Sequence, residues 1–293
     1  MPRFTGRQNS AQRRKPVARR TIALTIAGSD PDGGAGAQAD LNTFAALGVH
    51  GYSVITAITA QNSVRMERSI PVDPDTVTAQ IELLAAERKP GAVKTGALAN
   101  RAVVEAVVAA LRGLKLPRPV VDPVIISSSG MRLLEQGAEA VLRERLISMA
   151  MAVTPNIPEA ELLTGIVIDG MPAMREAAKA IHRMGARAVI VKGGHPFSAV
   201  PASRGVSRDG AGRVVDIFYD GRSFIELSAK RIATVGAHGT GCVFSAAIAA
   251  CLARGLNLEE SVRSAKRYVT NAIRYGYKLA PGGRLILNHF ARR

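Results

Sequence analysis

The chain has 293 residues, of which 47% are apolar and 4% aromatic, with no tryptophan. This length and apolar content suit one large α/β domain with a substantial core. Because no apolar run reaches the roughly 18 residues that a membrane span needs, we expect a soluble protein. The formal net charge of +16 raises nucleic acid as a partner.

Much of this charge lies in the first twenty residues. Residues 1–20 contain seven arginines and lysines and no acid. They also lack the apolar stretch of a secretory signal, so we predict a disordered basic tail. Without these seven charges the rest of the chain still carries +9, but it lacks interleaved aromatics, zinc-ligand spacing and a DNA-reading basic helix. We therefore interpret the charge as a solvated surface that attracts anionic substrates, and we expect no specific nucleic-acid partner.

After the tail, short apolar runs alternate with helix-length segments. The predicted strands are 21–27, 51–58, 91–94, 119–122, 151–154, 187–192, 213–219 and 223–228. The predicted helices are 36–47, 74–87, 99–112, 133–147, 157–164, 171–184, 240–254 and 258–277. Strands separated by helices predict right-handed crossovers and a mostly parallel sheet with helices on both faces. The last two strands predict an antiparallel edge hairpin. We expect residues 21–293 to form a single domain, with a mobile loop at 196–212.

The first polar motif, AGSDPDGGAGAQAD at 27–40, follows a predicted strand and leads into a predicted helix. Three glycines in four positions let the backbone come close to a bound molecule. The spacing matches neither the dinucleotide fingerprint nor a Walker A loop. Taken alone, this motif is as compatible with a structural tight turn as with a binding site.

The second motif, Gly239-Thr240-Gly241-Cys242, leads into an alanine-rich helix. Backbone N–H groups and the positive helix end can converge there on one anion, which suits a transferring phosphoryl group. Cys242 would sit in the first turn, where we expect its thiol pKa to be lowered, and it is therefore a candidate base. The alternative is a small residue that packs the start of the helix.

The other cysteine, Cys251, lies nine positions after Cys242 in the same predicted helix. That spacing corresponds to about 13 Å along a helix axis, too far for a disulfide. Two reduced thiols indicate a cytoplasmic protein.

Further polar residues follow the predicted strands. Asn156 and Glu159 can present an amide and a carboxylate to a hydrated Mg²⁺, or can form an N-terminal helix capping box. Lys192, followed by two glycines, can place a positive charge near a phosphate. Gln61 and Asp122 also lie at predicted strand ends. Because the carboxyl ends of parallel strands meet at one edge of a sheet, we expect these groups to form one site.

In this order, the segments AGSDPDGGAGAQADLNTFAALG, ITAQNS, KTGAL, DPV, TPNIPEA, KGGH and HGTGC resemble the hydroxymethylpyrimidine/phosphomethylpyrimidine kinases of thiamine biosynthesis, which are ribokinase-like enzymes. The resemblance runs from Thr21 to Phe290. It implies a three-layer α/β/α fold and two successive phosphoryl transfers from ATP with Mg²⁺. The first goes to a hydroxymethyl oxygen, and the second goes to the phosphate just made.

The resemblance also implies roles for individual residues. The residues implied to contact the pyrimidine are Gly28, Asp40, Gln61, Ala97 and Val124. Those implied to handle Mg²⁺ and the phosphates of ATP are Asp122, Asn156, Glu159 and Lys192, with Asp122 and Glu159 as metal ligands. The implied anion hole is Gly239, Thr240 and Gly241, and Cys242 takes the place of the catalytic base.

Two departures from the family pattern leave alternatives open. Ala97 stands where the family usually has methionine, which should enlarge the pyrimidine pocket. The stretch 235–238 reads VGAH where the family commonly reads KNTH, on the expected nucleotide side. A pyridoxal kinase on the same fold is therefore the nearest rival, and a catalytically silent binder that its basic tail recruits to nucleic acid is a more distant one. A homodimer is also left open.

Overall fold

The computed structural model describes residues 20–127, 130–194, 212–232 and 236–291. Apart from Arg20 and Gly212, the predicted basic tail and the predicted mobile loop lie outside these ranges. Among the described helices, none combines the length and the apolarity needed to cross a lipid bilayer.

A nine-stranded sheet forms the middle layer, in the order β3-β2-β1-β4-β5-β6-β7-β8-β9. Its strands are β1 (Ile22–Ser29), β2 (His50–Gln61), β3 (Met66–Pro71), β4 (Ala92–Thr95), β5 (Val120–Val121), β6 (Ala152–Val153), β7 (Val189–Val191), β8 (Arg213–Tyr219) and β9 (Phe224–Lys230). Six neighbouring strands in this order run parallel to one another: β2, β1, β4, β5, β6 and β7. The hairpin β8–β9 makes one antiparallel edge, as predicted, and β3 makes a second one that was not predicted.

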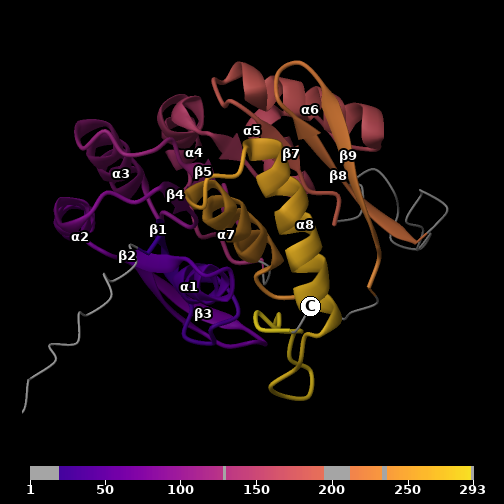
Figure 1. Ribbon diagram of the computed structural model, residues 1–293, viewed down its shortest axis with the longest axis horizontal. Coiled ribbons are helices and arrows are strands. Elements are labelled where there is room, and N and C mark those ends of the chain that lie inside the picture. The colour runs from indigo at the N-terminus through magenta and orange to yellow at the C-terminus, as the bar shows by residue number, and fades with distance from the viewer. Residues whose placement is uncertain (1–19, 128–129, 195–211, 233–235, 292–293) are drawn as a thin grey trace, which may run out of the picture.

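Helices cover both faces of the sheet (Figure 1). On one face lie α1 (Gly36–Ala46), α7 (Thr240–Ala253) and α8 (Leu258–Arg274). On the other lie α2 (Pro74–Glu87), α3 (Arg101–Gly113), α4 (Ala138–Val141), α5 (Ile157–Thr164) and α6 (Met171–Arg183). The predicted three-layer α/β/α architecture with a mostly parallel sheet is confirmed.

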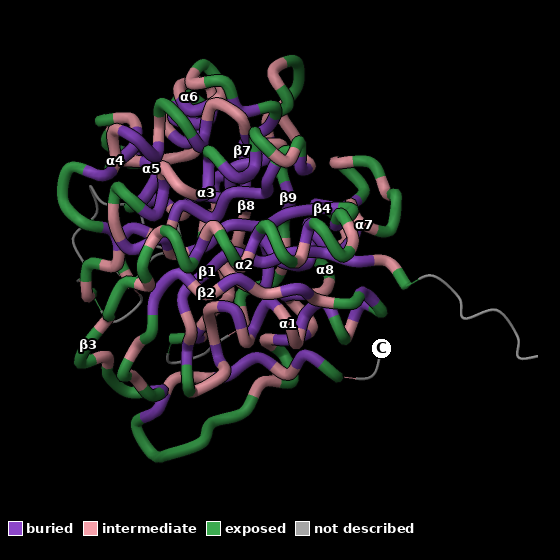
Figure 2. The backbone as a smooth tube through the Cα atoms, turned by 90° about the vertical axis from the view of Figure 1, so that its left-hand side faces the viewer, coloured by how far each residue is buried: buried purple, intermediate pink, exposed green. Residues whose placement is uncertain are grey.

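The alternation of side chains along the strands creates two apolar cores. Leu24 and Ile26 of β1 pack with α2 and α3 residues, whereas Ala23 between them packs with α1 and α7 residues on the opposite face. The same alternation places Val121 and Val120 in different cores. Figure 2 shows buried backbone through the strands and exposed stretches on the outer sides of the helices. Helix α7 is apolar on all sides because it is enclosed by the sheet, α1 and α8.

The helix predicted at 133–147 is wrong in its first half. The N–H groups of Leu133 and Leu134 donate instead to the carbonyl oxygen of Ile125, at 2.8 and 3.2 Å. Gly137 then adopts a left-handed conformation (φ 89°), and helix begins only at Ala138. Local pairing across this turn therefore overrides the apolar pattern that predicted the longer helix.

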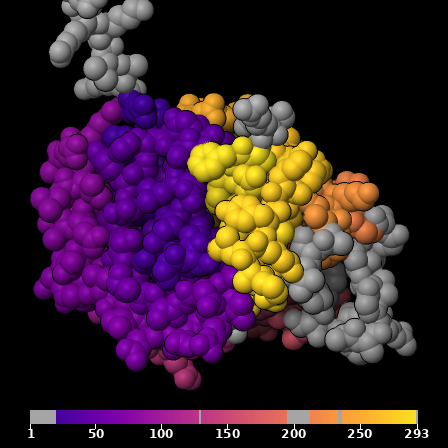
Figure 3. All heavy atoms as spheres, turned by 90° about the horizontal axis from the view of Figure 1, so that it is seen from below, coloured from indigo at the N-terminus to yellow at the C-terminus, as the bar shows by residue number. Residues whose placement is uncertain are grey.

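The segment after α8 runs back across the molecule to the N-terminal half, and Figure 3 shows it (yellow) against the indigo surface of the early residues. Its residue Leu285 forms a parallel bridge with Ala237. The N–H of Arg284 donates to the carbonyl oxygen of Ser63 at 3.1 Å. Near its end, His289 Nδ1 lies 3.3 Å from the hydroxyl of Thr43 in α1. Residues distant in sequence thus meet at one end of the sheet.

Candidate active site

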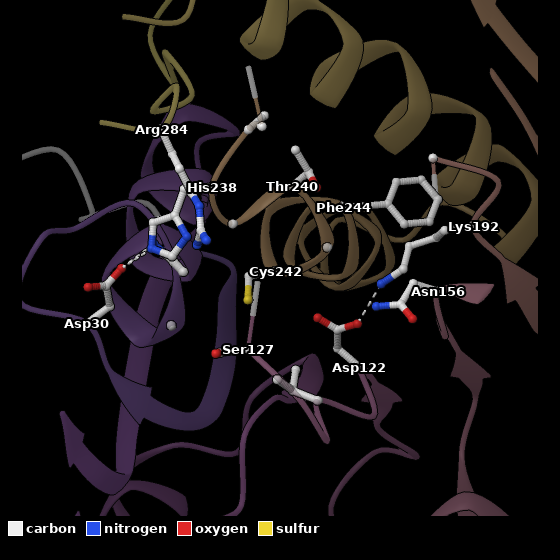
Figure 4. Close-up of a pocket in the computed structure, with 18 of the residues that line it drawn as sticks. Asp30, Asp122, Ser127, Asn156, Lys192, His238, Thr240, Cys242, Phe244 and Arg284 are labelled. Carbon is white, nitrogen blue, oxygen red and sulfur yellow. Dashed lines mark hydrogen bonds and ion pairs between the residues drawn. The ribbon is translucent and has the colours of Figure 1, made fainter. Parts of the chain in front are cut away.

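A cavity of about 720 Å³ lies at the carboxyl ends of the parallel strands. Part of its lining is drawn in Figure 4. All but one of the residues assigned to the site from the sequence line this cavity: Gly28, Gln61, Ala97, Asp122, Val124, Asn156, Glu159, Lys192, Gly239, Thr240, Gly241 and Cys242. The exception is Asp40. The parallel crossovers therefore bring the predicted polar groups to a single place.

The two glycine-rich motifs pack directly against each other. Gly239 has a left-handed backbone (φ 72°) just before α7, and a Cβ there would collide with the carbonyl oxygen of Gly34. Two residues later, a Cβ on Gly241 would lie 2.8 Å from Lys192 Nζ. Glycine at both positions lets the start of α7 approach the first motif and the charged residues. Its free N–H groups therefore face the cavity, where an anion can bind.

The side chain of Cys242 enters the cavity from the first turn of α7 (Figure 4). Burial raises the pKa of its thiol to about 12, and the nearby Asp122 and Asp40 add to this effect. Lys94 and a hydrogen bond from the Gly36 N–H oppose the rise without cancelling it. The prediction of a lowered thiol pKa is therefore wrong, because desolvation outweighs the helix terminus, and the thiol is protonated at neutral pH.

Asp40 lies behind the cavity wall. Its side chain and that of Lys94 are both fully buried, and Lys94 Nζ lies 2.7 Å from Asp40 Oδ2. The hydroxyl of Thr25 donates to the same oxygen at 2.6 Å. Burial alone would lower the pKa of Lys94, but Asp40, with smaller contributions from Cys242 and Asp122, more than compensates, so the pKa of Lys94 lies above its usual value. Asp40 thus holds a charged lysine at the cavity floor, and in this structure it does not face the space that a pyrimidine would occupy.

A second ion pair lies at the opposite side of the site. Lys192 Nζ lies 2.9 Å from Asp122 Oδ1, which also accepts a hydrogen bond from the Thr154 hydroxyl at 3.1 Å. The bridge between Asn156 and Lys192 joins the residues that follow β6 and β7. This arrangement places one lysine beside the start of α7, where a phosphate would also contact the backbone N–H groups.

Asn156 and Glu159 form an N-terminal capping box, one of the two roles that the sequence predicted for them. The Glu159 N–H donates to Asn156 Oδ1 and the Asn156 N–H donates to Glu159 Oε2, both at 2.8 Å. Both residues nevertheless line the cavity. Burial, opposed by Lys192 and reinforced by Asp122, raises the pKa of Glu159 to about 8. The cap and a role at the site are therefore compatible.

The carboxylates of Asp122 and Glu159 suit a hydrated Mg²⁺. The described residues contain no group of three or more histidine, cysteine or carboxylate side chains that could enclose a metal. Mg²⁺ keeps several of its waters, however, and is commonly held by one or two carboxylates together with substrate phosphates. The two carboxylates line one cavity, and the negative charge of Asp122 is among the causes that raise the pKa of Glu159. A cation between them would relieve that repulsion.

The comparisons with known proteins agree with this geometry. The sequence matches the family described as phosphomethylpyrimidine kinase over residues 30–286. The chain belongs to the phosphomethylpyrimidine kinase family. A hydroxymethylpyrimidine/phosphomethylpyrimidine kinase of Rhizobium meliloti is 46% identical, over 92% of this chain and 97% of that protein. A thiamine biosynthesis bifunctional protein of Geobacter sulfurreducens is 44% identical over 92% of this chain, which spans about half (52%) of that longer protein.

Solved structures of this kinase family and of pyridoxal kinases share the fold. The phosphomethylpyrimidine kinase of Clostridium difficile superposes with a TM-score of 0.73 at 38% identity, over 87% of this chain and all of that one. The pyridoxal kinase of Staphylococcus aureus, in complex with AMP-PCP and pyridoxal, gives a TM-score of 0.81 at 32% identity, over 93% and 94% of the two chains. These likenesses confirm the ribokinase-like architecture.

Several charged or titratable residues that line the cavity were given no role from the sequence, and four of them lie near the assigned residues. These four are Asp30, Lys94, His238 and Arg284. A lysine inside the apolar strand β4 was a signal, because a buried charge requires a partner. Nothing in the sequence links Asp30 to His238, 208 positions away, although their side chains meet at 3.0 Å. Arg284 reaches the site only through the path of the C-terminal segment.

Proposed function

We propose that the protein transfers the γ-phosphate of ATP to 4-amino-5-hydroxymethyl-2-methylpyrimidine, and then transfers a second phosphate to the monophosphate, as a step of thiamine biosynthesis. The observation that carries this proposal is one continuous cavity. It joins an amide at Gln61, small apolar walls at Ala97 and Val124, and the glycine-rich start of α7. Names of the curated relatives at 38–46% identity support the same substrate. We further propose that residues 21–293 act as a single kinase domain in the cytoplasm.

The acceptor ring would bind at the Gln61 end of the cavity. The side chain of Gln61 forms a hydrogen bond with the carboxylate of Asp30, which can only accept, so the amide nitrogen is the donor. The amide oxygen of Gln61 remains as an acceptor for the exocyclic amino group of an aminopyrimidine. Ala97 and Val124 supply apolar surface for the ring. Asp40, which was expected to contact the ring, would act on it only indirectly, through Lys94.

The phosphates would bind at the other end, where the N-terminus of α7 and Lys192 converge. Asp122 and Glu159 would hold Mg²⁺, which when bound supplies positive charge to the phosphates of ATP. The hydroxymethyl oxygen would lie next to Cys242. Because that thiol is protonated in the free protein, a role as base requires the prior loss of its proton. The Gly36 N–H and Lys94 favour the thiolate and would assist that loss.

A coupled ATP-turnover assay with hydroxymethylpyrimidine and pyridoxal, repeated with Cys242→Ala, tests this function. We expect turnover of the pyrimidine and a decrease in kcat of about 10²- to 10⁴-fold in the variant, the usual contribution of a positioned proton-transfer group. Cys251→Ala is a matched control, since Cys251 is buried in the same helix and does not line the cavity. Absence of turnover with either ring would contradict the proposed function.

The pyridoxal kinase alternative has one observation in its favour. A Cβ built on Gly28 would lie 3.8 Å from the Ala97 Cβ, so two small residues face each other where a longer side chain at 97 would fill the space. The extra room suits a larger, differently substituted ring. Preference for pyridoxal in the same assay, reversed in favour of the pyrimidine by Ala97→Met, would move the assignment to this alternative.

A further inference from the structure

Arg284 comes from the C-terminal segment and lines the cavity. Its own N–H donates to Ser63, two residues beyond Gln61. The next residue, Leu285, accepts a hydrogen bond from the His238 N–H at 2.8 Å and donates to Gly236 at 3.0 Å. The backbone is thereby fixed between the loop after β2 and the loop before the anion hole. Figure 4 shows the Arg284 side chain next to the His238 imidazole, with Cys242 the next labelled residue toward the middle of the cavity.

Three of the four lysines that line the cavity have a close carboxylate partner. Lys94 pairs with Asp40 at 2.7 Å, Lys192 with Asp122 at 2.9 Å and Lys266 with Asp216 at 2.7 Å. Lys192 lies beside the start of α7, at the proposed phosphate end, whereas Lys94 lies at the floor. Arg65, at the ring end of the cavity, is paired with Glu67 at 2.7 Å. Arg284 adds a positive charge beside His238, next to the loop that leads into the anion hole.

The carboxylate of Asp30 also lies at this side of the cavity, and its charge is already well compensated. It accepts hydrogen bonds from the N–H groups of Ala35 at 2.7 Å and Asp32 at 3.0 Å, and it lies 3.0 Å from His238 Nε2. An anion beside Arg284 would face the imidazole of His238, which lies against the Asp30 carboxylate. The region can therefore accept negative charge.

We infer that Arg284 binds the phosphate of the monophosphate acceptor and so serves the second phosphoryl transfer more than the first. This inference rests on the proposed function. A monophosphate whose ring lies at Gln61 and whose end reaches the anion hole has its phosphate between those two points, and the backbone of Arg284 is fixed between the loops next to them. A guanidinium can contact two phosphate oxygens at once, which makes arginine well suited to this position.

The chemistry of the two acceptors explains why the two steps need different residues. In the first step the oxygen of a neutral hydroxyl attacks the γ-phosphorus and forms a new P–O bond. The bond between the γ-phosphorus and the β–γ bridging oxygen breaks, and ADP leaves with that electron pair. The proton of the hydroxyl must be accepted by another group. In the second step the attacking oxygen belongs to a phosphate with a second pKa of about 6, which is largely deprotonated at pH 7. No base is required there, but two anions must be brought together. Cys242 serves the first demand as the thiolate, after its own proton has passed to solvent, and accepts the hydroxyl proton. Arg284 serves the second.

Steady-state kinetics with hydroxymethylpyrimidine and with its monophosphate, each as the starting acceptor, test the inference. For Arg284→Ala we expect kcat/KM for the monophosphate to fall about 10- to 100-fold more than kcat/KM for the alcohol, from the loss of charge-assisted hydrogen bonds. Cys242→Ala should give the opposite pattern. Arg284→Lys, which keeps the charge but not the paired donors, should recover part of the loss. Arg274→Ala, an exposed change at the end of α8, is the charge-matched control and should leave both steps unchanged.

Calorimetric titration with the monophosphate in the absence of ATP gives a second measurement that does not depend on turnover. We expect Arg284→Ala to weaken that binding by a similar factor, and the difference from the native chain to shrink at high salt. Equal losses for both acceptors, or unchanged binding of the monophosphate, would overturn the inference and leave the proposed function intact. Failure of the native chain to phosphorylate either acceptor would instead contradict the proposed function.

Discussion

Lys94 and Cys242 show how strongly the surroundings of a single side chain decide its chemistry. Both face the same cavity, one from β4 and the other from α7. The carboxylate of Asp40 keeps Lys94 charged although its side chain is fully buried. For Cys242, the nearby Lys94 and the Gly36 N–H stabilise the thiolate too weakly to offset burial, and the pKa of its thiol is raised to about 12. A fully buried ammonium group and a protonated thiol therefore coexist at the floor of the site.

At this scale we predict that Lys94→Met destabilises the protein. The substitution removes one partner of a fully buried ion pair and leaves Asp40 without its counter-charge. Loss of one partner from such a pair costs about 3–5 kcal/mol. Urea unfolding at pH 7 measures the change in the free energy of unfolding.

The double variant Lys94→Met with Asp40→Leu is the control, because removing both charges removes the penalty of an unpaired one. We expect it to be more stable than the single variant. A single variant within about 1 kcal/mol of the native chain would mean that Asp40 finds another partner or takes up a proton at little cost.

Among the structural elements, the C-terminal segment depends on a histidine that is buried in its neutral form. His289 is 8% exposed, and its Nδ1 lies 3.3 Å from the Thr43 hydroxyl and 3.4 Å from the Tyr268 hydroxyl. Burial lowers the pKa of His289 to about 4, from an ordinary value of 6.5. The segment that positions Arg284 is thus fastened to α1 and α8 by a group that acid would charge.

We predict that the stability of the protein falls in mild acid for this reason. The pKa of His289 is lower in the folded than in the unfolded chain, so protons bind the unfolded chain preferentially between pH 6.5 and 4. The contribution is fully present above pH 6.5 and is lost as the pH falls toward 4, up to about 3 kcal/mol. His289→Asn cannot titrate in this range. Urea unfolding at pH 7, 6, 5 and 4 should therefore give a shallower decline for the variant, and parallel curves would argue against this role.

The sequence predicted the elements well where apolar residues alternate along a strand or recur along one face of a helix. Helices α2 and α5 begin and end where expected. Asp73 and Asn156 cap their N-termini with side chains, and Gly165 in a left-handed conformation (φ 73°) follows the last residue of α5. The edge strand β3 was not expected because most of its residues are exposed, so no apolar alternation marks it. The helix at 133–147 failed because Gly137 and the pairing to Ile125 act across a turn.

For the site, the sequence located the residues that directly follow parallel strands, since the topology of such a sheet decides where those ends meet. It could not reveal that Asp40 pairs with Lys94, because their separation of 54 positions leaves their relative depth undetermined. It also placed Cys242 at a helix start but could not weigh that position against burial. The position of Arg284 required knowledge of how the last residues run back to the loop after β2.

For the molecule as a whole, the excess positive charge is divided between two parts with separate consequences. Seven of the positive charges lie in residues 1–20, and the remaining +9 belongs to the rest of the chain. Ion pairs neutralise three of the lysines that line the cavity, Lys94, Lys192 and Lys266. Much of the long-range field that would attract anionic ligands therefore comes from the surface.

We predict that deletion of residues 1–20 leaves kinase turnover unchanged and weakens non-specific binding to nucleic acid. Loss of seven charges should reduce the slope of log K against log salt for duplex DNA by up to about 6. Fluorescence anisotropy with a labelled duplex at several salt concentrations measures this slope. A deletion that keeps the native slope would locate the binding on the folded part, and a deletion that impairs turnover would give the segment a role in catalysis.

The contact between Arg284 and Ser63 has a consequence for the time at which the enzyme becomes active. The ribosome makes the loop after β2 early and the residues that reach it some 220 positions later. A nascent chain can pair strands β1 to β9 before residues 284–289 have left the exit tunnel, but it cannot yet make the contacts of these residues with Ser63 and Thr43. Messages truncated shortly before codon 284 should therefore yield products that lack the contacts of residues 284–289 with Ser63 and Thr43, and we expect these products to be inactive.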